Sequence, residues 1–141
     1  MGYTHYWYKK PELPQDKWDA FAKDVKNFTE EGFCSGILCF EYDSPTVEPK
    51  VGKNFVRFNG VNINGGETFF FDRKQVKGVW SQMDEDGLYF NSCKTNRRAY
   101  DKYVVEVLKL ARQHFGDDIK LSSDGGEQVF QNTELKNDLN K

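Results

Sequence analysis

The chain has 141 residues, 16% of them aromatic, and a formal net charge of −2 at pH 7. This length predicts one domain with a core of its own, and the aromatic content argues against a disordered chain. The near balance of charge argues against a protein that coats DNA or RNA generically. No apolar run approaches the roughly 18 residues of a membrane span, and we expect no secretory signal peptide, because no basic and apolar stretch opens the chain.

The three cysteines are Cys34, Cys39 and Cys93. An odd number without a secretion signal predicts reduced thiols and a cytoplasmic location, in the host cell if a phage encodes the protein. Cys34 and Cys39 have no second pair and no histidine nearby, which is weak spacing for zinc. We interpret both as small apolar core residues and expect no metal or other cofactor.

The order of patterned segments predicts an α+β fold, in which a mostly antiparallel sheet packs against two main helices. We expect residues 1–130 to form the domain and residues 131–141 a loose polar tail. Alternating or continuous apolar residues of strand length predict strands at residues 3–8, 36–42, 54–59, 67–72, 75–80, 88–93 and 119–122. The run at residues 36–42 has the composition of a central strand, and residues 54–72 have the pattern of a hairpin with a roomy connection.

Apolar residues at helical spacing predict the two helices. The first runs over residues 15–28, after Pro14, and Gly32 closes the segment. The second covers residues 100–115, with Gly116 placed to cap its C-terminus.

The most informative segment joins the sixth predicted strand to the second helix and carries Lys94, Arg97 and Arg98. A helix N-terminus has a partial positive charge and unpaired N–H groups, so cations there are unfavourable without an anion. A bound phosphate or carboxylate would make the dipole, the amides and the cations act together. The alternative is a solvated basic turn, with Asp101 as its partner within the chain and Thr95 or Asn96 as the helix cap.

Three further segments carry candidate ligand groups. The loop of residues 59–67 has glycines that allow close backbone approach, amides from asparagine, and Glu67 as an acceptor for ribose hydroxyls; an ordinary hairpin turn has the same composition. Residues 122–126 combine two serines with Asp124, which suits ribose, phosphate or a capping turn. The aromatic residues 3–8 include His5 and offer rings for stacking, although core packing explains most of them.

Together these segments resemble a family of small uncharacterised proteins of phages, plasmids and bacterial genomes. The motifs that carry the resemblance are GYTHY at residues 2–6, FNG at 58–60, ETF at 67–69, CKT at 93–95 with Arg97, YD at 100–101 and SSDG at 122–125. The resemblance extends to about residue 125 and implies that the segments form one site, because such motifs recur together in the family.

The sequence departs from this family in two places. Relatives carry acidic residues and a histidine in the hairpin loop, where this chain has Ile63, Asn64 and Gly66. Their Lys-Pro before the Tyr-Asp pair is Arg98-Ala99 here. The basic segment survives these changes, whereas chemistry that needs a loop histidine or a pair of loop carboxylates does not.

Three functional hypotheses follow. The first is a small binding protein of the phage type that sequesters an anionic nucleotide, such as a cyclic or ADP-ribose-type immune signal, and so counteracts host defence; a homodimer is the expected assembly. The second is a small enzyme that cleaves a nucleotide or phosphoester with His5, Glu67, Asp101 or Asp124 as acid or base. The third is a protein–protein interaction module. The residues predicted to bind the ligand are Lys94, Thr95, Arg97, Arg98, Tyr100, Asp101, Asn59, Glu67, Thr68, His5, Trp7, Ser122, Ser123 and Asp124.

Overall fold

A computed structural model describes residues 2–41, 43–75 and 83–131. It confirms the α+β fold class, with mostly antiparallel strands and two main helices. The strands are β1 (Thr4–Lys9), β2 (Leu38–Cys39), β3 (Lys50–Val51), β4 (Phe55–Gly60), β5 (Phe69–Asp72), β6 (Tyr89–Lys94) and β7 (Ile119–Ser123). The helices are α1 (Gln15–Cys34) and α2 (Asp101–Phe115), and short 3-10 turns lie at Asn62–Asn64, Gly116–Asp118 and Glu127–Phe130.

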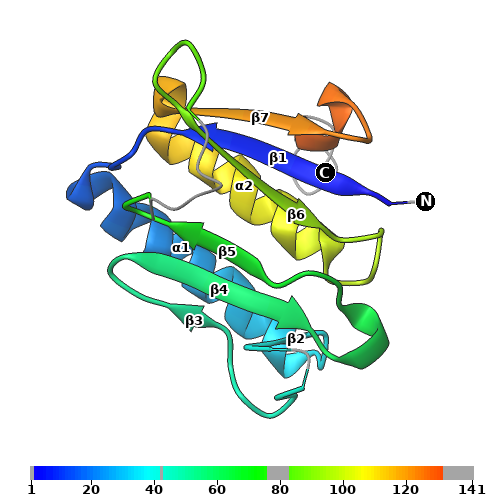
Figure 1. The fold of residues 1–141 in the computed structure, drawn as a ribbon. Helices are drawn as coiled ribbons and strands as arrows, with labels where there is room; N and C mark the ends of the chain where they lie inside the picture. Colours follow the sequence, from blue (N-terminus) through cyan, green and yellow to red (C-terminus); the bar gives the residue numbers. More distant parts are fainter. Residues whose placement is uncertain (1, 42, 76–82, 132–141) are drawn as a thin grey trace, which may run out of the picture.

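The strands form two antiparallel groups that lie edge to edge (Figure 1). In one group β1 is central, between β6 and β7; in the other, β4 pairs with β2, β3 and β5. The Glu67 N–H donates to the carbonyl of Lys94 (3.1 Å), which joins the segment before β5 to the end of β6. Both helices lie behind the strands in Figure 1, so the described helices and strands leave one face of the β6–β1–β7 group uncovered.

One hydrophobic core joins both helices to both groups of strands. The apolar stripe of α1 supplies Trp18, Phe21 and Val25, because residues three or four apart share a helix face. The rings of Trp18 and Phe21 contact aromatic side chains of the strands. The apolar face of α2 completes the core. The remaining fully buried members include Phe58, Phe69, Phe71, Tyr103, Val104, Val107 and Leu108.

The structure corrects several element boundaries. Gly32 does not end the first helix, which continues to Cys34. A Cβ atom at Gly32 would lie 2.6 Å from Leu38 Cδ1 and 2.8 Å from Tyr103 Cε1, so glycine permits close packing inside the helix. The predicted central strand at residues 36–42 is only the two residues of β2 at an edge, and β3 forms within a predicted loop.

Other predictions hold. The β4–β5 hairpin and the second helix form where expected, and Gly116 ends α2 with φ of 56°. Cys39 is buried as predicted, whereas Cys34, also predicted to be a core residue, is exposed; Cys93 is buried as well. The predicted strand at residues 75–80 and the tail lie largely outside the described residues. Among the residues that the structure describes, neither helix has the length and apolar character needed to cross a membrane.

Candidate functional site

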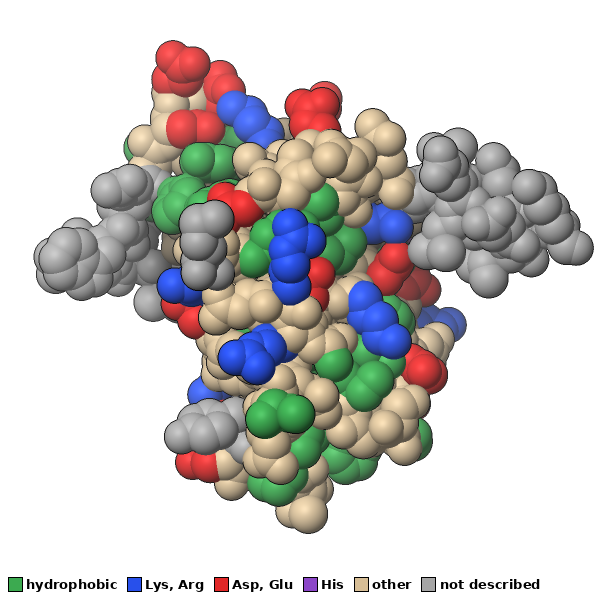
Figure 2. Space-filling model, turned by 90° about the vertical axis from the view of Figure 1, so that its right-hand side faces the viewer, with side chains coloured by type: hydrophobic (Ala, Val, Ile, Leu, Met, Phe, Trp, Pro, Cys, Tyr) green, Lys and Arg blue, Asp and Glu red, His purple; other side chains and the backbone are tan. Residues whose placement is uncertain are grey.

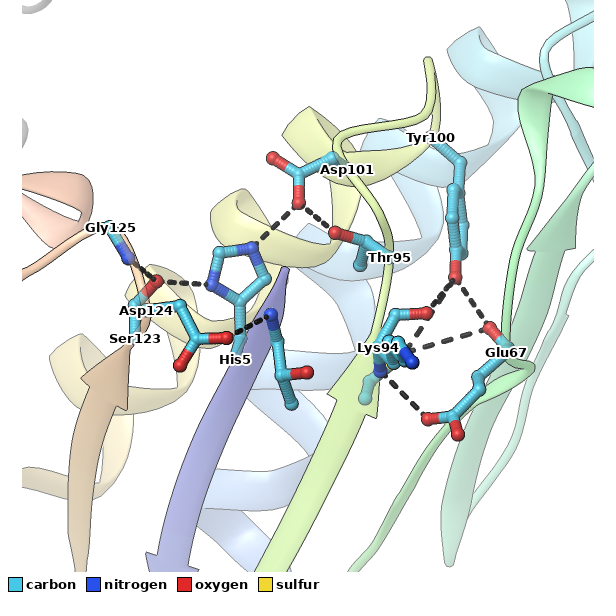
Figure 3. Close-up of polar contacts among 11 residues, drawn as sticks. His5, Glu67, Lys94, Thr95, Tyr100, Asp101, Ser123, Asp124 and Gly125 are labelled. Carbon is cyan, nitrogen blue, oxygen red and sulfur yellow. Dashed lines mark hydrogen bonds and ion pairs between the residues drawn. The ribbon is translucent and has the colours of Figure 1, made fainter. Parts of the chain in front are cut away.

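A buried histidine links three elements at one end of the molecule (Figure 3). His5 lies on β1, and its Nδ1 atom is 2.8 Å from the Ser123 hydroxyl at the end of β7. Its Nε2 atom is 2.7 Å from Asp101 Oδ1 in the first turn of α2. Residues separated by about 100 positions in the sequence are therefore joined through one ring.

Charge and hydrogen bonding fix the donors in this network. Burial opposes ionisation of Asp101, but hydrogen bonds from His5 and Thr95 and the nearby Arg97 charge outweigh it, so the pKa of Asp101 lies below its usual value. An ionised Asp101 only accepts, so His5 Nε2–H donates to it. In a neutral imidazole the other ring nitrogen accepts from the Ser123 hydroxyl. The Ser123 oxygen in turn accepts the Gly125 N–H (3.1 Å).

Aromatic rings seal His5 from solvent. The edge of the Tyr3 ring approaches the imidazole at a centroid distance of 5.1 Å, and Phe130 lies 5.8 Å away. His5 has no exposed surface, although the Asp101 side chain remains 21% exposed. The network is therefore closed on the histidine side and touches solvent at its carboxylate.

A second carboxylate, Asp124, holds the start of β1. Its Oδ2 atom accepts the Thr4 N–H (3.0 Å), and its Oδ1 atom accepts the Tyr6 hydroxyl (2.9 Å). The hydrogen bond to Asp124 raises the pKa of Tyr6 above its usual value, so the hydroxyl stays protonated. Asp124 thus orients a tyrosine on the uncovered face of the sheet.

The hairpin loop is held to β6 by its own polar groups. Glu67 Oε1 accepts the Lys94 N–H (2.7 Å), and the buried Tyr100 hydroxyl donates to the Glu67 carbonyl (2.6 Å), as Figure 3 shows. Asn59 is buried and donates to the Gly66 carbonyl (3.0 Å) and to the Thr68 hydroxyl (3.1 Å). These contacts shape the loop and leave Asn59 buried away from any ligand.

The three cations of the basic segment do not gather at the α2 N-terminus as predicted, because Asp101 occupies the first turn of the helix. Arg97 turns back over the Tyr3 ring, with its Cζ atom 3.8 Å from the ring centroid. Asn96 and Arg97 both have left-handed backbone, with φ of 54° and 58°. This conformation is unfavourable for side chains other than glycine, and such residues concentrate at functional sites.

Lys94 and Arg98 instead border an open depression with Gly2 and Asn96 (about 690 Å³). This volume falls within the range of small-molecule sites. Within residues 2–41, 43–75 and 83–131, neither the Lys94 ammonium nor the Arg98 guanidinium has a hydrogen-bond or ion-pair partner. Figure 2 shows Lys and Arg side chains spread over this end of the molecule, with Asp and Glu side chains beside several of them.

The structure gathers some predicted site residues and separates others. His5, Thr95, Asp101 and Ser123 share one network, and Glu67, Lys94 and Tyr100 share another. Trp7 does not reach either: it is buried between the sheet and the helices, 5.3 Å from Phe69 and 5.9 Å from Phe71 by ring centroid. Ser122 lies on the uncovered face, opposite Tyr6 in the strand register.

Three residues of this region were absent from the predicted set. Gly2 faces Lys94 so closely that a Cβ atom would lie 2.5 Å from Lys94 Cε. Tyr3 supports Arg97, and Asn96 borders the depression. For Asn96 the sequence did hold a signal. Asparagine tolerates left-handed backbone better than most residues, so its place in a short basic connection indicates a tight turn there. No signal in the sequence marks Tyr3 as the residue on which Arg97 stacks.

Among the residues described, no group of three His, Cys, Asp or Glu side chains is placed to hold a metal ion. No protein-family model matches the sequence, and no curated protein or solved structure is significantly similar to it. The functional argument therefore depends on the geometry of this end of the molecule.

Proposed function

We propose that the protein binds a small anionic nucleotide, with its phosphate held in the depression between Lys94 and Arg98. The observation that carries the proposal is this pair of cations, which lies beside an open concavity and has no acidic partner within the described residues. Elsewhere, lysines and arginines beside carboxylates form ion pairs, as Lys10 does with Asp118 (3.0 Å). An anion in the depression would complete the charge balance that the chain itself leaves open there.

The backbone of the same turn adds donors. Within the described part of the chain, the N–H groups of Arg97 and Ala99 have no acceptor. The Arg98 N–H between them donates to the Thr95 carbonyl (3.0 Å), so these two free N–H groups are not consecutive. Backbone N–H groups beside left-handed residues contribute to concave anion sites in many proteins. The unfavourable backbone at Asn96 and Arg97 is consistent with a turn shaped for a ligand.

Binding without turnover is the better-supported form of this proposal. His5 is buried with both ring nitrogens engaged, and Asp124 accepts two hydrogen bonds. Glu67 accepts the Lys94 N–H. The acid–base candidates are thus committed to holding the chain together. If a phage encodes the protein, sequestration of a nucleotide immune signal would counteract host defence; that extension rests on the family resemblance.

The test is calorimetric titration of the purified chain with a panel of linear and cyclic nucleotides and ADP-ribose. We expect binding to at least one nucleotide, weakened at least tenfold in a Lys94→Gln/Arg98→Gln double variant. Lys23→Gln, an exposed lysine of α1, is the matched control and should bind normally. The ligand should be recovered unchanged after denaturation. Absence of binding across the panel, or an unaffected double variant, would reject the proposal.

A second candidate function has one specific observation in its favour. Ser123, His5 and Asp101 form the hydroxyl–imidazole–carboxylate order of a nucleophile, its base and the group that orients the base. In that role the Ser123 oxygen would form a covalent ester with the phosphoryl or acyl group as the bond to the leaving alcohol breaks. His5 would take the Ser123 proton and pass it to that alcohol, and water would then hydrolyse the Ser123 ester. Ser123→Ala distinguishes the two: it would abolish any product formation in an enzyme and leave nucleotide affinity unchanged in a binding protein.

A further inference from the structure

The uncovered face of the β6–β1–β7 group carries an aromatic patch that the site described above does not use. Tyr6 and Tyr8 lie on β1, and Phe90 lies on β6 directly opposite Tyr8. Ring centroids are 5.9 Å apart for Tyr6 and Phe90, and 5.3 Å for Tyr8 and Phe90. We call these three rings the aromatic platform.

Strand geometry places the platform and the cation site on the same face. Side chains of directly opposed residues in antiparallel strands share a face, and so do residues two apart along a strand. The register pairs Tyr6 with Ser92 and Thr4 with Lys94. Lys94 is therefore two residues beyond Ser92 on the face that carries Tyr6 and Phe90, a rise of roughly 7 Å along β6.

The platform is partly exposed: Tyr6 and Tyr8 are half-buried, and Phe90 is exposed. Phe90 has 37% of its surface accessible, while most large apolar side chains of the described chain are buried. The helices cover the opposite face, so no described element packs over these rings (Figure 1). Hydroxyl groups flank the central ring, because Tyr6 lies between Ser92 on β6 and Ser122 on β7.

We infer that the base of the nucleotide stacks on the aromatic platform while its phosphate lies at Lys94; this inference rests on the proposed function. The charge of the site selects this occupant, because Lys94 lies on the same face, two register positions beyond Tyr6 and Ser92. Its ammonium has no partner among the described residues, which suits a ring attached to an anion. Ser92 and Ser122 then flank the ribose. The hydrogen bond to Asp124 holds the Tyr6 ring in place for stacking.

The experiment compares binding of AMP and GMP with that of ribose 5-phosphate, which lacks a base, to the full chain by calorimetry. Base–aromatic stacking contributes roughly 5-fold to 150-fold in affinity, so we expect at least one nucleotide to bind five times or more tighter than ribose 5-phosphate. Phe90→Leu keeps an apolar side chain but removes the ring, and it should lose most of that preference while retaining affinity for ribose 5-phosphate.

Phe70→Leu is the matched control, because Phe70 is an equally exposed phenylalanine (41%) on β5, in the other group of strands. It should keep the full preference. Equal affinity for nucleotides and ribose 5-phosphate, or an unchanged preference in Phe90→Leu, would overturn the stacking inference and leave the phosphate site intact. No binding of these three probes or of any other member of the nucleotide panel would overturn the proposed function itself. A Phe90→Leu variant that loses only self-association in sedimentation would assign the platform to a dimer interface instead.

Discussion

The two ends of β1 bury different kinds of polar residue. Side chains of β1 alternate between the faces of the sheet, so His5 and Lys9 both point toward the helices. At one end His5 connects to Asp101 and Ser123; at the other, the fully buried Lys9 ammonium lies 2.7 Å from Asp72 Oδ1 and 3.1 Å from Gln75.

The ends differ in what surrounds the buried group. Burial lowers the pKa of Lys9 despite the opposing effect of Asp72, and the buried ammonium and the Asp72 carboxylate form an ion pair there. Around His5 the interior is also satisfied, but the adjoining surface carries Lys94 and Arg98 without partners in the described chain. The Lys9 end of β1 therefore stabilises the fold. The His5 end combines a stabilising interior with a surface that is open to a ligand.

The largest expected effect is at the Lys9 end. Lys9→Met leaves the Asp72 carboxylate in a low-dielectric site without its ammonium, so we expect the free energy of unfolding to fall by about 3 kcal/mol in urea denaturation. Lys10→Met is the matched control, because Lys10 is the next residue and its pair with Asp118 is exposed. That variant should lose no more than about 1 kcal/mol. Equal losses would show that burial does not distinguish the two pairs.

At the other end, His5→Ala removes a ring that bonds Asp101 and Ser123 and packs between Tyr3 and Phe130. A hydrogen bond to a charged group contributes about 1.5–3 kcal/mol, so we expect a loss of about 2–3 kcal/mol in the same assay. His114→Ala tests the other histidine, whose contact with Asp24 (2.8 Å) lies at the surface. A loss there as large as that of His5→Ala would contradict a special role for the β1–α2–β7 connection.

The His5 end also predicts a dependence of stability on pH. The pKa of Asp101 in the folded chain lies below the usual 3.8, so its ionised form stabilises the fold above about pH 5. That contribution is lost as the pH falls through the folded pKa. Asp101→Asn should therefore destabilise the chain at pH 7 and make much less difference near pH 3. Urea denaturation at both pH values gives the comparison, and a difference that is constant with pH would show that ionisation of Asp101 does not contribute.

Local patterns in the sequence predicted most of the fold. Helical spacing identified α2 to within one residue, because its buried and exposed residues alternate with the helical period and Gly116 follows it. The same reasoning ended α1 too early at Gly32, where the reason for glycine is contact with Leu38 and Tyr103. A close approach between distant segments leaves no local signal. The apolar run at residues 36–42 led to the wrong prediction of a central strand for a related reason. Leu38 and Cys39 are buried, as in a central strand, but they lie in a strand at the edge of the sheet.

The site could be predicted in part. The motifs around His5, Asp101 and Ser123 are rich in polar groups, and the structure brings these residues into one network. The sequence could not predict the direction in which each side chain of the site points. Trp7 is two residues from His5 on the same face, but the core aromatic residues surround it. The side chains of Arg97 and Arg98 diverge because the left-handed backbone of the turn directs one onto Tyr3 and the other to the depression.

These two neighbouring arginines give the smallest expected effects and the sharpest separation of stability from binding. Arg97→Ala removes the contact with Tyr3 and should lower the free energy of unfolding by about 0.5–1 kcal/mol. Arg98→Ala removes a cation without a partner in the described chain, so the change should stay within about 0.5 kcal/mol of zero. Urea denaturation of both variants at low salt decides this. If Arg98→Ala destabilised the chain as much as Lys9→Met, its charge would belong to the fold, and the contrast between the two ends of β1 would no longer hold.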